Sequence, residues 1–222
     1  MLPDGNKKIK SKSGKIELKY DFPEKPSLEA QVSKKIVVIF AHHNFTDSRI
    51  QRSLLKGISK LQNVEIRDLY KLYPDYFIDA KKEQSSLAEA DLIIFQHPIN
   101  WYSSPAILKE WQDIVLEYGY AYGEKGTALK GKDFLQVIST GGSKDVYQTT
   151  GNNRFKIEEF LRPFEATAYL CGIHYHKPFV VHEAYRISDE QLEKKTQDYV
   201  SLLNNYLENG NAVLQSLNTH NF

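Results

Sequence analysis

Residues 96–113 read Gln-His-Pro-Ile-Asn-Trp-Tyr-Ser-Ser-Pro-Ala-Ile-Leu-Lys-Glu-Trp-Gln-Asp, and the predicted organisation of the chain follows from this stretch. The preceding run, residues 91–95, is short and apolar, as expected of a strand buried on both faces of a parallel sheet. The two serines before Pro105 are typical of a helix start, and apolar residues then recur at helical spacing. Trp101 and Tyr102 are therefore predicted to lie in a strand-to-helix loop, at the sheet edge where open α/β folds bind ligands.

The remaining chain continues this alternation of strands and helices. We expect further strands at residues 36–40, 64–69, 134–139 and 175–182, and helices at residues 50–61, 83–90, 157–171 and 189–207. Pro163 should either kink the third of these helices or mark a second helix start. The pattern predicts an α/β fold, a doubly wound five-stranded parallel sheet with helices on both faces.

Composition limits the class of protein. The 222 residues include 29 basic and 28 acidic side chains, a net charge of +1 that indicates no attraction to nucleic acid. The single cysteine, Cys171, excludes an internal disulfide framework and a cysteine-based zinc site. Without a long apolar run or a signal-peptide pattern, we expect a soluble, cytoplasmic protein. Residues 1–34 are interpreted as a flexible arm, residues 35–209 as the domain, and residues 210–222 as a frayed tail.

Three predicted loops carry the residues suited to ligand binding. Residues 41–48, 97–103 and 139–143 follow parallel strands, so they should share one edge of the sheet. The first loop precedes a helix N-terminus, whose free N–H groups bind phosphate. The glycines of the third loop would let backbone N–H groups approach a flat, electron-rich ring. Together with the aromatic pair of the second loop, these features describe a flavin nucleotide site.

Each feature also has an ordinary structural explanation. A histidine in a first loop is often a capping or surface residue, and Thr-Gly-Gly is often only a turn. Trp111 fits the helix's apolar stripe better than a ligand site. His174, His176 and His182 share an alternating pattern that suits a metal, but nothing nearby completes a ligand set, so we predict no metal site. Phosphate-loop, nucleophile-elbow and zinc-protease motifs are absent.

The residues of these loops resemble a known family. The segments 97–111, 120–123 and 139–142 are similar to the flavodoxin-like NAD(P)H:quinone oxidoreductases, and within them to the bacterial ancillary flavoproteins of glutathione-regulated potassium-efflux systems. The resemblance covers residues 34–207. It implies a flavodoxin-like homodimer with flavin at the dimer interface. The flavin would be reduced by NAD(P)H and would pass two electrons to a quinone in a ping-pong sequence.

The resemblance also implies specific site residues. The phosphate end falls on His42, Ser48, Arg49, Ile50 and Gln51. The flavin ring contacts fall on Ile99, Asn100, Trp101, Tyr102, Ser139, Thr140, Gly141 and Gly142. Gly141, Gly142, Tyr147 and Asn153 are the expected catalytic positions, although family members carry a histidine where Asn153 stands, and an amide cannot supply a proton.

Several alternatives stay open at this point. The flavin is FMN by the nearest resemblance, but the wider family includes FAD enzymes. NADH and NADPH are not distinguished, and an azo or nitro compound would serve as acceptor equally well. The protein could instead be a regulatory subunit of a potassium-efflux antiporter, held at the inner face of the membrane by that partner, with flavin as a structural or sensing ligand.

Overall fold

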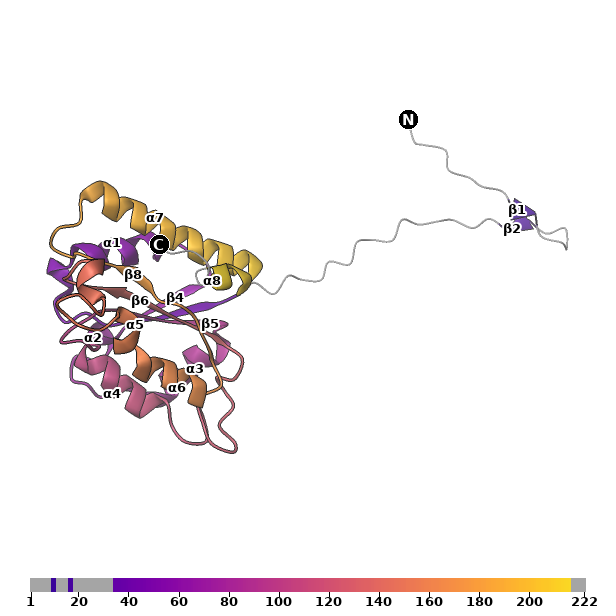
Figure 1. Cartoon of the computed structure of the whole chain (residues 1–222). Helices are drawn as coiled ribbons and strands as arrows, with labels where there is room; N and C mark the ends of the chain where they lie inside the picture. Colours follow the sequence, from indigo (N-terminus) through magenta and orange to yellow (C-terminus); the bar gives the residue numbers. More distant parts are fainter. Residues whose placement is uncertain (1–8, 11–15, 18–33, 217–222) are drawn as a thin grey trace. The chain divides into compact units, whose positions relative to one another are not determined.

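The computed structural model describes residues 9–10, 16–17 and 34–216 (Figure 1). The chain divides into two compact units, Met1–Val32 and Ser33–Phe222. In the first unit, β1 (Ile9–Lys10) pairs antiparallel with β2 (Ile16–Glu17). The rest of the predicted N-terminal arm, and the predicted tail beyond residue 216, lie outside the described residues.

The second unit is organised around a parallel sheet. Its strands are β3 (Ile36–Phe40), β4 (Val64–Asp68), β5 (Leu92–Pro98), β6 (Asp133–Ser139), β7 (His174–Tyr175) and β8 (Phe179–Val181). The order is β4-β3-β5-β6, with β7 and β8 both paired to β6. The chain runs from β3 to β4 on one side and then crosses to β5 on the other, which is the predicted doubly wound arrangement.

The fifth predicted strand, residues 175–182, is interrupted. Asp133 pairs with His174 but Val137 pairs with Phe179, so the register offset changes from 41 to 42 (174 − 133 and 179 − 137). One extra residue is therefore accommodated between β7 and β8. Pro178 lies within this interval and has no N–H to donate to the ladder, which explains why the strand is divided in two.

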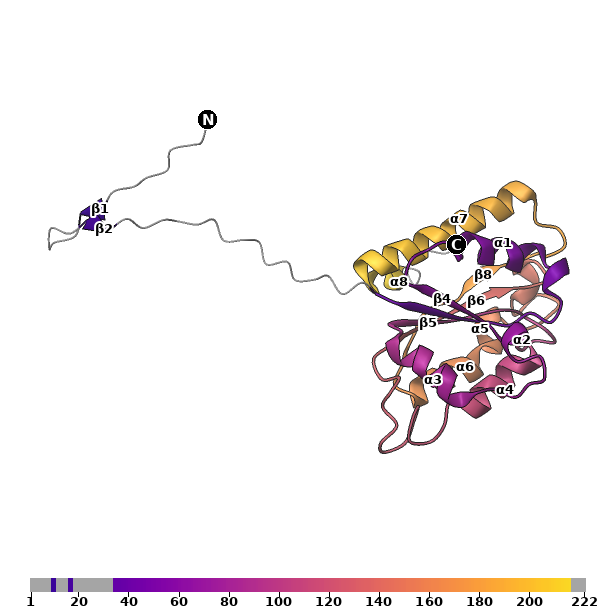
Figure 2. The ribbon, with the colours of Figure 1, turned by 180° about the vertical axis from the view of Figure 1, so that it is seen from behind.

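Helices cover both faces of the sheet (Figures 1 and 2). One face carries α1 (Arg49–Ile58), α7 (Asp189–Asn209) and α8 (Ala212–Ser216). The other carries α2 (Leu69–Leu72), α3 (Ala80–Glu89), α4 (Ala106–Val115), α5 (Ile157–Phe160) and α6 (Arg162–Leu170). Alternate residues of β3 enter the two apolar cores, Val37 and Ile39 on one side and Val38 and Phe40 on the other.

Two predicted boundaries are resolved by the structure. Pro163 marks a second helix start, because α5 ends at Phe160 and α6 begins at Arg162 with the proline in its first turn. The tail that we expected to be frayed after Gly210 instead contains α8. Leu214 of this helix is fully buried in the core beneath α7, which explains its order.

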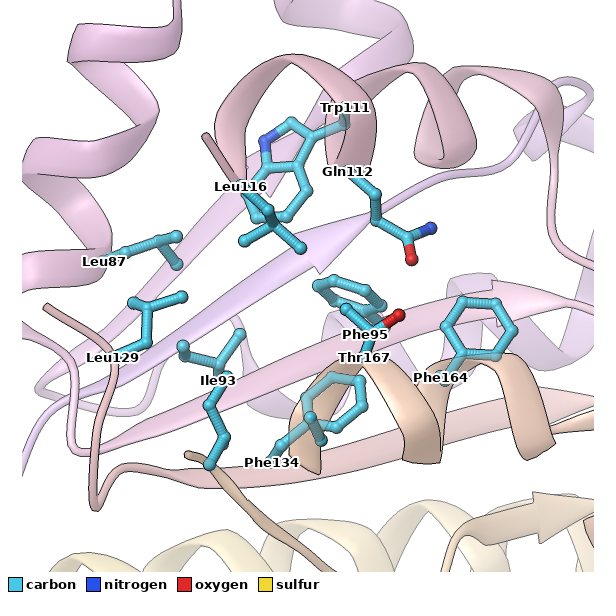
Figure 3. Close-up of a pocket in the computed structure, with 12 residues that line it drawn as sticks. Leu87, Ile93, Phe95, Trp111, Gln112, Leu116, Leu129, Phe134, Phe164 and Thr167 are labelled. Atoms are coloured by element: carbon cyan, nitrogen blue, oxygen red, sulfur yellow. The ribbon is translucent and has the colours of Figure 1, made fainter. Parts of the chain in front are cut away.

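A small apolar cavity lies inside the core formed by α4, α6 and the sheet (Figure 3). Its volume is about 20 Å³, and its walls include Phe95, Trp111 and Phe164. Trp111 is fully buried and its indole N–H donates to Glu83 Oε2 over 3.0 Å. The prediction that Trp111 belongs to the core is therefore confirmed, and the cavity is a packing gap rather than a ligand site.

Candidate functional site

Three loops meet at the carboxyl-terminal edge of the sheet. They follow β3, β5 and β6, which are adjacent and parallel. The Ile99 N–H donates to the Ser139 carbonyl over 2.8 Å, and the Asn100 amide approaches His43 Nδ1 at 3.4 Å. Because the strand order reverses between β3 and β5, these loops flank the position where open α/β sheets bind ligands.

The first loop presents a set of unused backbone donors. It contains the short helix η1 (Phe45–Asp47), after which Ser48 caps α1 by accepting the Gln51 N–H over 3.2 Å. The hydroxyl hydrogen of Ser48 remains available to donate. The N–H groups of residues 45, 46, 49 and 50 have no acceptor among the described residues. This donor set, at the positive end of a helix dipole, suits a phosphate group.

The side chains after Ser48 have other partners. The Arg49 guanidinium binds the Ile187 carbonyl over 3.2 Å and the Asp189 carboxylate over 2.5 Å. Ile50 is buried in the core beneath α1. Gln51 is also fully buried, and bonds to Ser139 and Gln96. Of the predicted phosphate contacts, Arg49 and Ile50 therefore offer backbone N–H groups, whereas the Gln51 side chain supports the site from inside.

His42 is held in one tautomer. Its Nδ1 accepts the Asn44 N–H over 3.1 Å, which leaves the proton of the neutral ring on Nε2. Burial, together with the nearby His43 ring, lowers the pKa of His42 to about 4. The two imidazoles stack with their centroids 5.5 Å apart. At neutral pH, His42 can therefore donate a hydrogen bond to a ligand but contributes no positive charge.

The second loop is a tight turn that holds the aromatic pair. Asn100 and Ser103 exchange backbone hydrogen bonds of 2.8 and 2.9 Å. The two residues between them, Trp101 and Tyr102, have φ of 47° and 65°, in the left-handed region that bulky residues rarely occupy. Such residues cluster at binding sites, where the surrounding structure compensates for the strain.

The two aromatic side chains of this turn differ in how many contacts hold them in place. Trp101 is 95% exposed. Tyr102 stacks on Phe160 with ring centroids 5.0 Å apart, and its hydroxyl donates to Asn153 Oδ1 over 3.3 Å. Tyr102 is thus tied to the segment after the glycine loop, while the indole of Trp101 is left to contact a ligand.

The third loop carries backbone donors at two adjacent glycines. The N–H groups of Gly141 and Gly142 have no acceptor among the described residues. A side chain at Gly142 would place its Cβ 2.5 Å from Val146 Cγ2, which explains the glycine there. At Gly141 a Cβ would meet only the ring of Tyr185, at 3.5 Å. The loop can therefore approach a ligand closely through its backbone.

Tyr147 and Asn153 come together behind this loop. Tyr147 is 7% exposed. Burial raises the pKa of Tyr147, and interaction with Tyr102 raises it further, whereas hydrogen bonding to the Thr140 and Asn153 side chains opposes the shift. The tyrosine is therefore neutral at physiological pH and can donate a hydrogen bond, with Asn153 as its neighbour.

Two residues of the site were not predicted. Tyr185 is 89% exposed beside Gly141, and its segment is tied to the glycine loop because Glu183 N–H donates to Gly142 and Ala184 N–H donates to Thr140. His182 Nδ1 lies 2.9 Å from Thr140 Oγ1. Sequence patterns gave no signal for Tyr185, and they grouped His182 with two other histidines. Those are elsewhere: His174 is exposed and His176 pairs with buried Asp133 over 2.7 Å.

No cluster of three or more metal-binding side chains occurs within residues 34–216 and the two short β-strands before them. Helices long and apolar enough for a membrane span are likewise lacking in that part of the chain. The donor set does fit a flavin nucleotide: backbone N–H groups at a helix start for phosphate, an exposed indole for the ring face, and glycine N–H groups for the ring's polar edge.

Comparisons with known proteins agree with this geometry. A family model described as a flavodoxin-like fold matches residues 34–203. KefG of Serratia proteamaculans, an ancillary protein of the glutathione-regulated potassium-efflux system, is 45% identical over 176 residues, which are 79% of this chain and 96% of the relative.

Two solved structures are also similar. The general stress protein 14 of Treponema denticola, solved in complex with FMN, is 35% identical with a TM-score of 0.72. The match covers 77% of this chain and 98% of the stress-protein chain. An NADPH-quinone reductase from P. pentosaceus is 30% identical with a TM-score of 0.70, and the match covers 79% of this chain and 98% of the reductase chain.

Proposed function

The chain belongs to the family with the flavodoxin-like fold, and on that premise we propose that it is a flavin-dependent NAD(P)H:quinone oxidoreductase. The observation that carries the proposal is the meeting of three parts at one sheet edge: the donors before α1, the Trp101–Tyr102 turn and the free N–H groups of Gly141 and Gly142. The similarity to an NADPH-quinone reductase supports the same reaction.

FMN is the proposed cofactor. The donors around Ser48 are suited to a terminal phosphate, and a structure 35% identical to this chain was solved with FMN. FAD is the alternative. Heat release of the bound cofactor followed by chromatography against both standards decides between them, and recovery of FAD alone would refute the FMN assignment.

The protein's own residues would act by position and polarity. A bound flavin supplies the two-electron chemistry. The N–H groups of Gly141 and Gly142 would stabilise negative charge at the polar edge of the ring, as donors of an oxyanion hole do. Tyr147, kept neutral by burial, can donate a hydrogen bond toward the same edge, while Asn153 orients its hydroxyl. Trp101 would form one wall of the space that the nicotinamide and the quinone occupy in turn.

The test combines a spectrum and an assay. The purified full chain should show flavin absorbance, or gain it on addition of FMN, and should oxidise NADPH or NADH in the presence of menadione. Separate assays with each nucleotide establish the preference, and quinone, azo and nitro acceptors compared at equal concentration establish the acceptor. A protein that binds no flavin and oxidises neither NADPH nor NADH would refute the proposal.

A regulatory role is the second candidate. It is favoured by the 45% identity to an ancillary protein of a potassium-efflux system. In this case the chain would bind the antiporter at the inner face of the membrane and use flavin as a structural or sensing ligand. Capture by the antiporter's cytosolic domain tests binding. A transport assay with a variant that retains flavin but not quinone reduction then separates regulation from catalysis.

We also propose a homodimer. Large apolar side chains are exposed on α2, α4 and the adjoining loops, including Phe77 at 83% and Tyr118 at 71%. Pairing of two such faces would cover them and add a second wall beside Trp101. Light scattering of the full chain should give twice the 25.6 kDa chain mass, and a monomer that binds flavin normally would refute the shared site.

A further inference from the structure

A set of interacting polar side chains runs from the aromatic turn to the far side of the glycine loop. The Tyr102 hydroxyl donates to Asn153 Oδ1 over 3.3 Å. The Asn153 and Thr140 side chains both lower the pKa of Tyr147, and Thr140 Oγ1 lies 2.9 Å from His182 Nδ1. His182 is thus the last member of a connected set that includes both proposed walls of the flavin site.

The donors and acceptors in this set can be assigned. Thr140 Oγ1 donates to the Gly142 carbonyl over 2.9 Å, and a hydroxyl has only one hydrogen to donate. The bond to His182 must therefore come from the imidazole, so His182 contributes Nδ1–H to Thr140 Oγ1. The neutral ring of His182 must then be the Nδ1–H tautomer, with an unprotonated Nε2. That nitrogen has no hydrogen-bond partner among the described residues.

The bond from Thr140 to Gly142 matters because it crosses the glycine loop. Thr140 is 1% exposed, and the Gly142 carbonyl also accepts the Glu183 N–H over 3.1 Å. Two donors on one carbonyl hold the peptide plane after Gly142 and limit rotation of that residue, so they restrain the loop that carries the two preceding N–H groups. If Thr140 turned its hydrogen toward His182, one of these two restraints would be lost.

We propose that His182 is a positioning residue for the glycine loop: its Nδ1–H occupies a lone pair of Thr140 Oγ1, which directs the threonine hydrogen to the Gly142 carbonyl and so aims the Gly141 and Gly142 N–H groups at the flavin. The inference rests on the proposed function only for the identity of that ligand. No bond is formed or broken, and His182 itself does not touch the flavin.

The surroundings of His182 agree with this role. Its ring packs against that of Tyr147 with centroids 5.8 Å apart, and it borders a groove of about 530 Å³ that also contacts Lys144, Lys195 and Glu158. These three residues, from η2 (Lys144–Tyr147), α7 and α5, are the charged side chains that interact with His182 among the described residues, and Tyr147 is a neutral ionisable neighbour. Burial and the two lysines lower the pKa of His182, against a smaller opposite effect of the Gly142 carbonyl and Glu158, which keeps the ring neutral.

The test uses the different positions of the amide nitrogens in asparagine and glutamine. His182→Asn places an N–H near the former Nδ1, whereas His182→Gln places one near the former Nε2 and His182→Leu provides none. The FMN dissociation constant of the full chain should rise about tenfold in the Gln and Leu variants, as expected for one net hydrogen bond. The Asn variant should stay within about twofold of wild type, on the same scale. The midpoint potential of the bound flavin should become more negative in the His182→Gln and His182→Leu variants only.

The controls separate this inference from the proposed function. His174→Leu, at an exposed position of β7, should change neither quantity. Nitrogen-15 NMR of the cofactor-free protein should show His182 with its proton on Nδ1. Equal behaviour of the three variants, or a proton on Nε2, would overturn the inference. A wild-type protein that binds no flavin would instead refute the proposed function, while the NMR result would still decide the tautomer.

Discussion

Gln51 Nε2 donates a 2.9 Å hydrogen bond to Ser139 Oγ, which joins α1, behind the loop after β3, to the strand that leads into the glycine loop. Gln51 Oε1 accepts from Gln96 Nε2 over 3.1 Å, and Gln96 Oε1 accepts from the Tyr199 hydroxyl over 3.1 Å. All four side chains are buried, so this polar chain connects α7, β5, α1 and β6 through the core.

Replacing Gln51 with leucine should destabilise the protein. The change leaves buried groups of Ser139 and Gln96 without partners, and an unsatisfied buried group costs about 1–3 kcal/mol. We expect the free energy of unfolding in urea to fall by about that amount, with an unchanged denaturant slope. Gln112→Leu is a matched control, because among the described residues the Gln112 side chain bonds only to its own helix, at Leu108. Equal stability of the two variants would contradict the proposed importance of the polar chain.

Substitution of Trp101 should separate backbone strain from ligand contact. Trp101→Gly removes the cost of a positive φ, about 1 kcal/mol or more, whereas Trp101→Ala retains it. Thermal unfolding should therefore rank the glycine variant as the more stable of the two. Both variants lose the indole, so both should bind FMN more weakly by fluorescence titration. An alanine variant with full flavin affinity and turnover would show that the ring wall lies elsewhere.

Much of the fold, but less of the candidate site, could be predicted from the sequence. The parallel sheet and the three loops at its carboxyl-terminal edge followed from apolar runs, caps and glycines, which are local signals. The division of the last strand depended on a register change against β6, and the burial of Leu214 depended on α7. Tyr185 and His182 joined the site through contacts with residues about forty positions earlier, which no local pattern records. Arg49 was predicted at the phosphate end, and the partners of its guanidinium, Ile187 and Asp189, lie about 140 positions later, which no local pattern records either.

His97 should make the fold sensitive to acid. The ring is completely buried, its Nδ1 bonds to the Pro98 carbonyl over 2.9 Å, and its Nε2 has no partner in the described part of the chain. Burial lowers the pKa of His97 to about 4. The unfolded state, with its ordinary histidine pKa near 6.5, therefore binds this proton first as the pH falls.

The resulting loss of stability should occur between about pH 6.5 and pH 4 and reach about 3 kcal/mol for this one group. Below that window both states are protonated, and the contribution of His97 becomes constant. His97→Phe keeps an aromatic ring against Phe164 but cannot bind the proton. The slope of unfolding free energy against pH reports the number of protons taken up on unfolding, so in this window the slope for the variant should correspond to about one proton fewer. Urea denaturation at a series of pH values measures the slope, and parallel curves for the two proteins would exclude His97 as the source.

The two glycines of the third loop should respond differently to the same substitution. Gly142→Ala would bring a methyl group within 2.5 Å of Val146 Cγ2, whereas Gly141→Ala meets only the Tyr185 ring at an ordinary 3.5 Å. We expect Gly142→Ala to lower the unfolding free energy by about 1–3 kcal/mol, the usual cost of overpacking, and to weaken FMN binding because the loop must shift. Gly141→Ala should keep the wild-type stability and affect flavin binding alone. Adding Val146→Ala to Gly142→Ala removes the clashing atom, so stability should recover, and a double variant no more stable than Gly142→Ala would contradict the steric explanation.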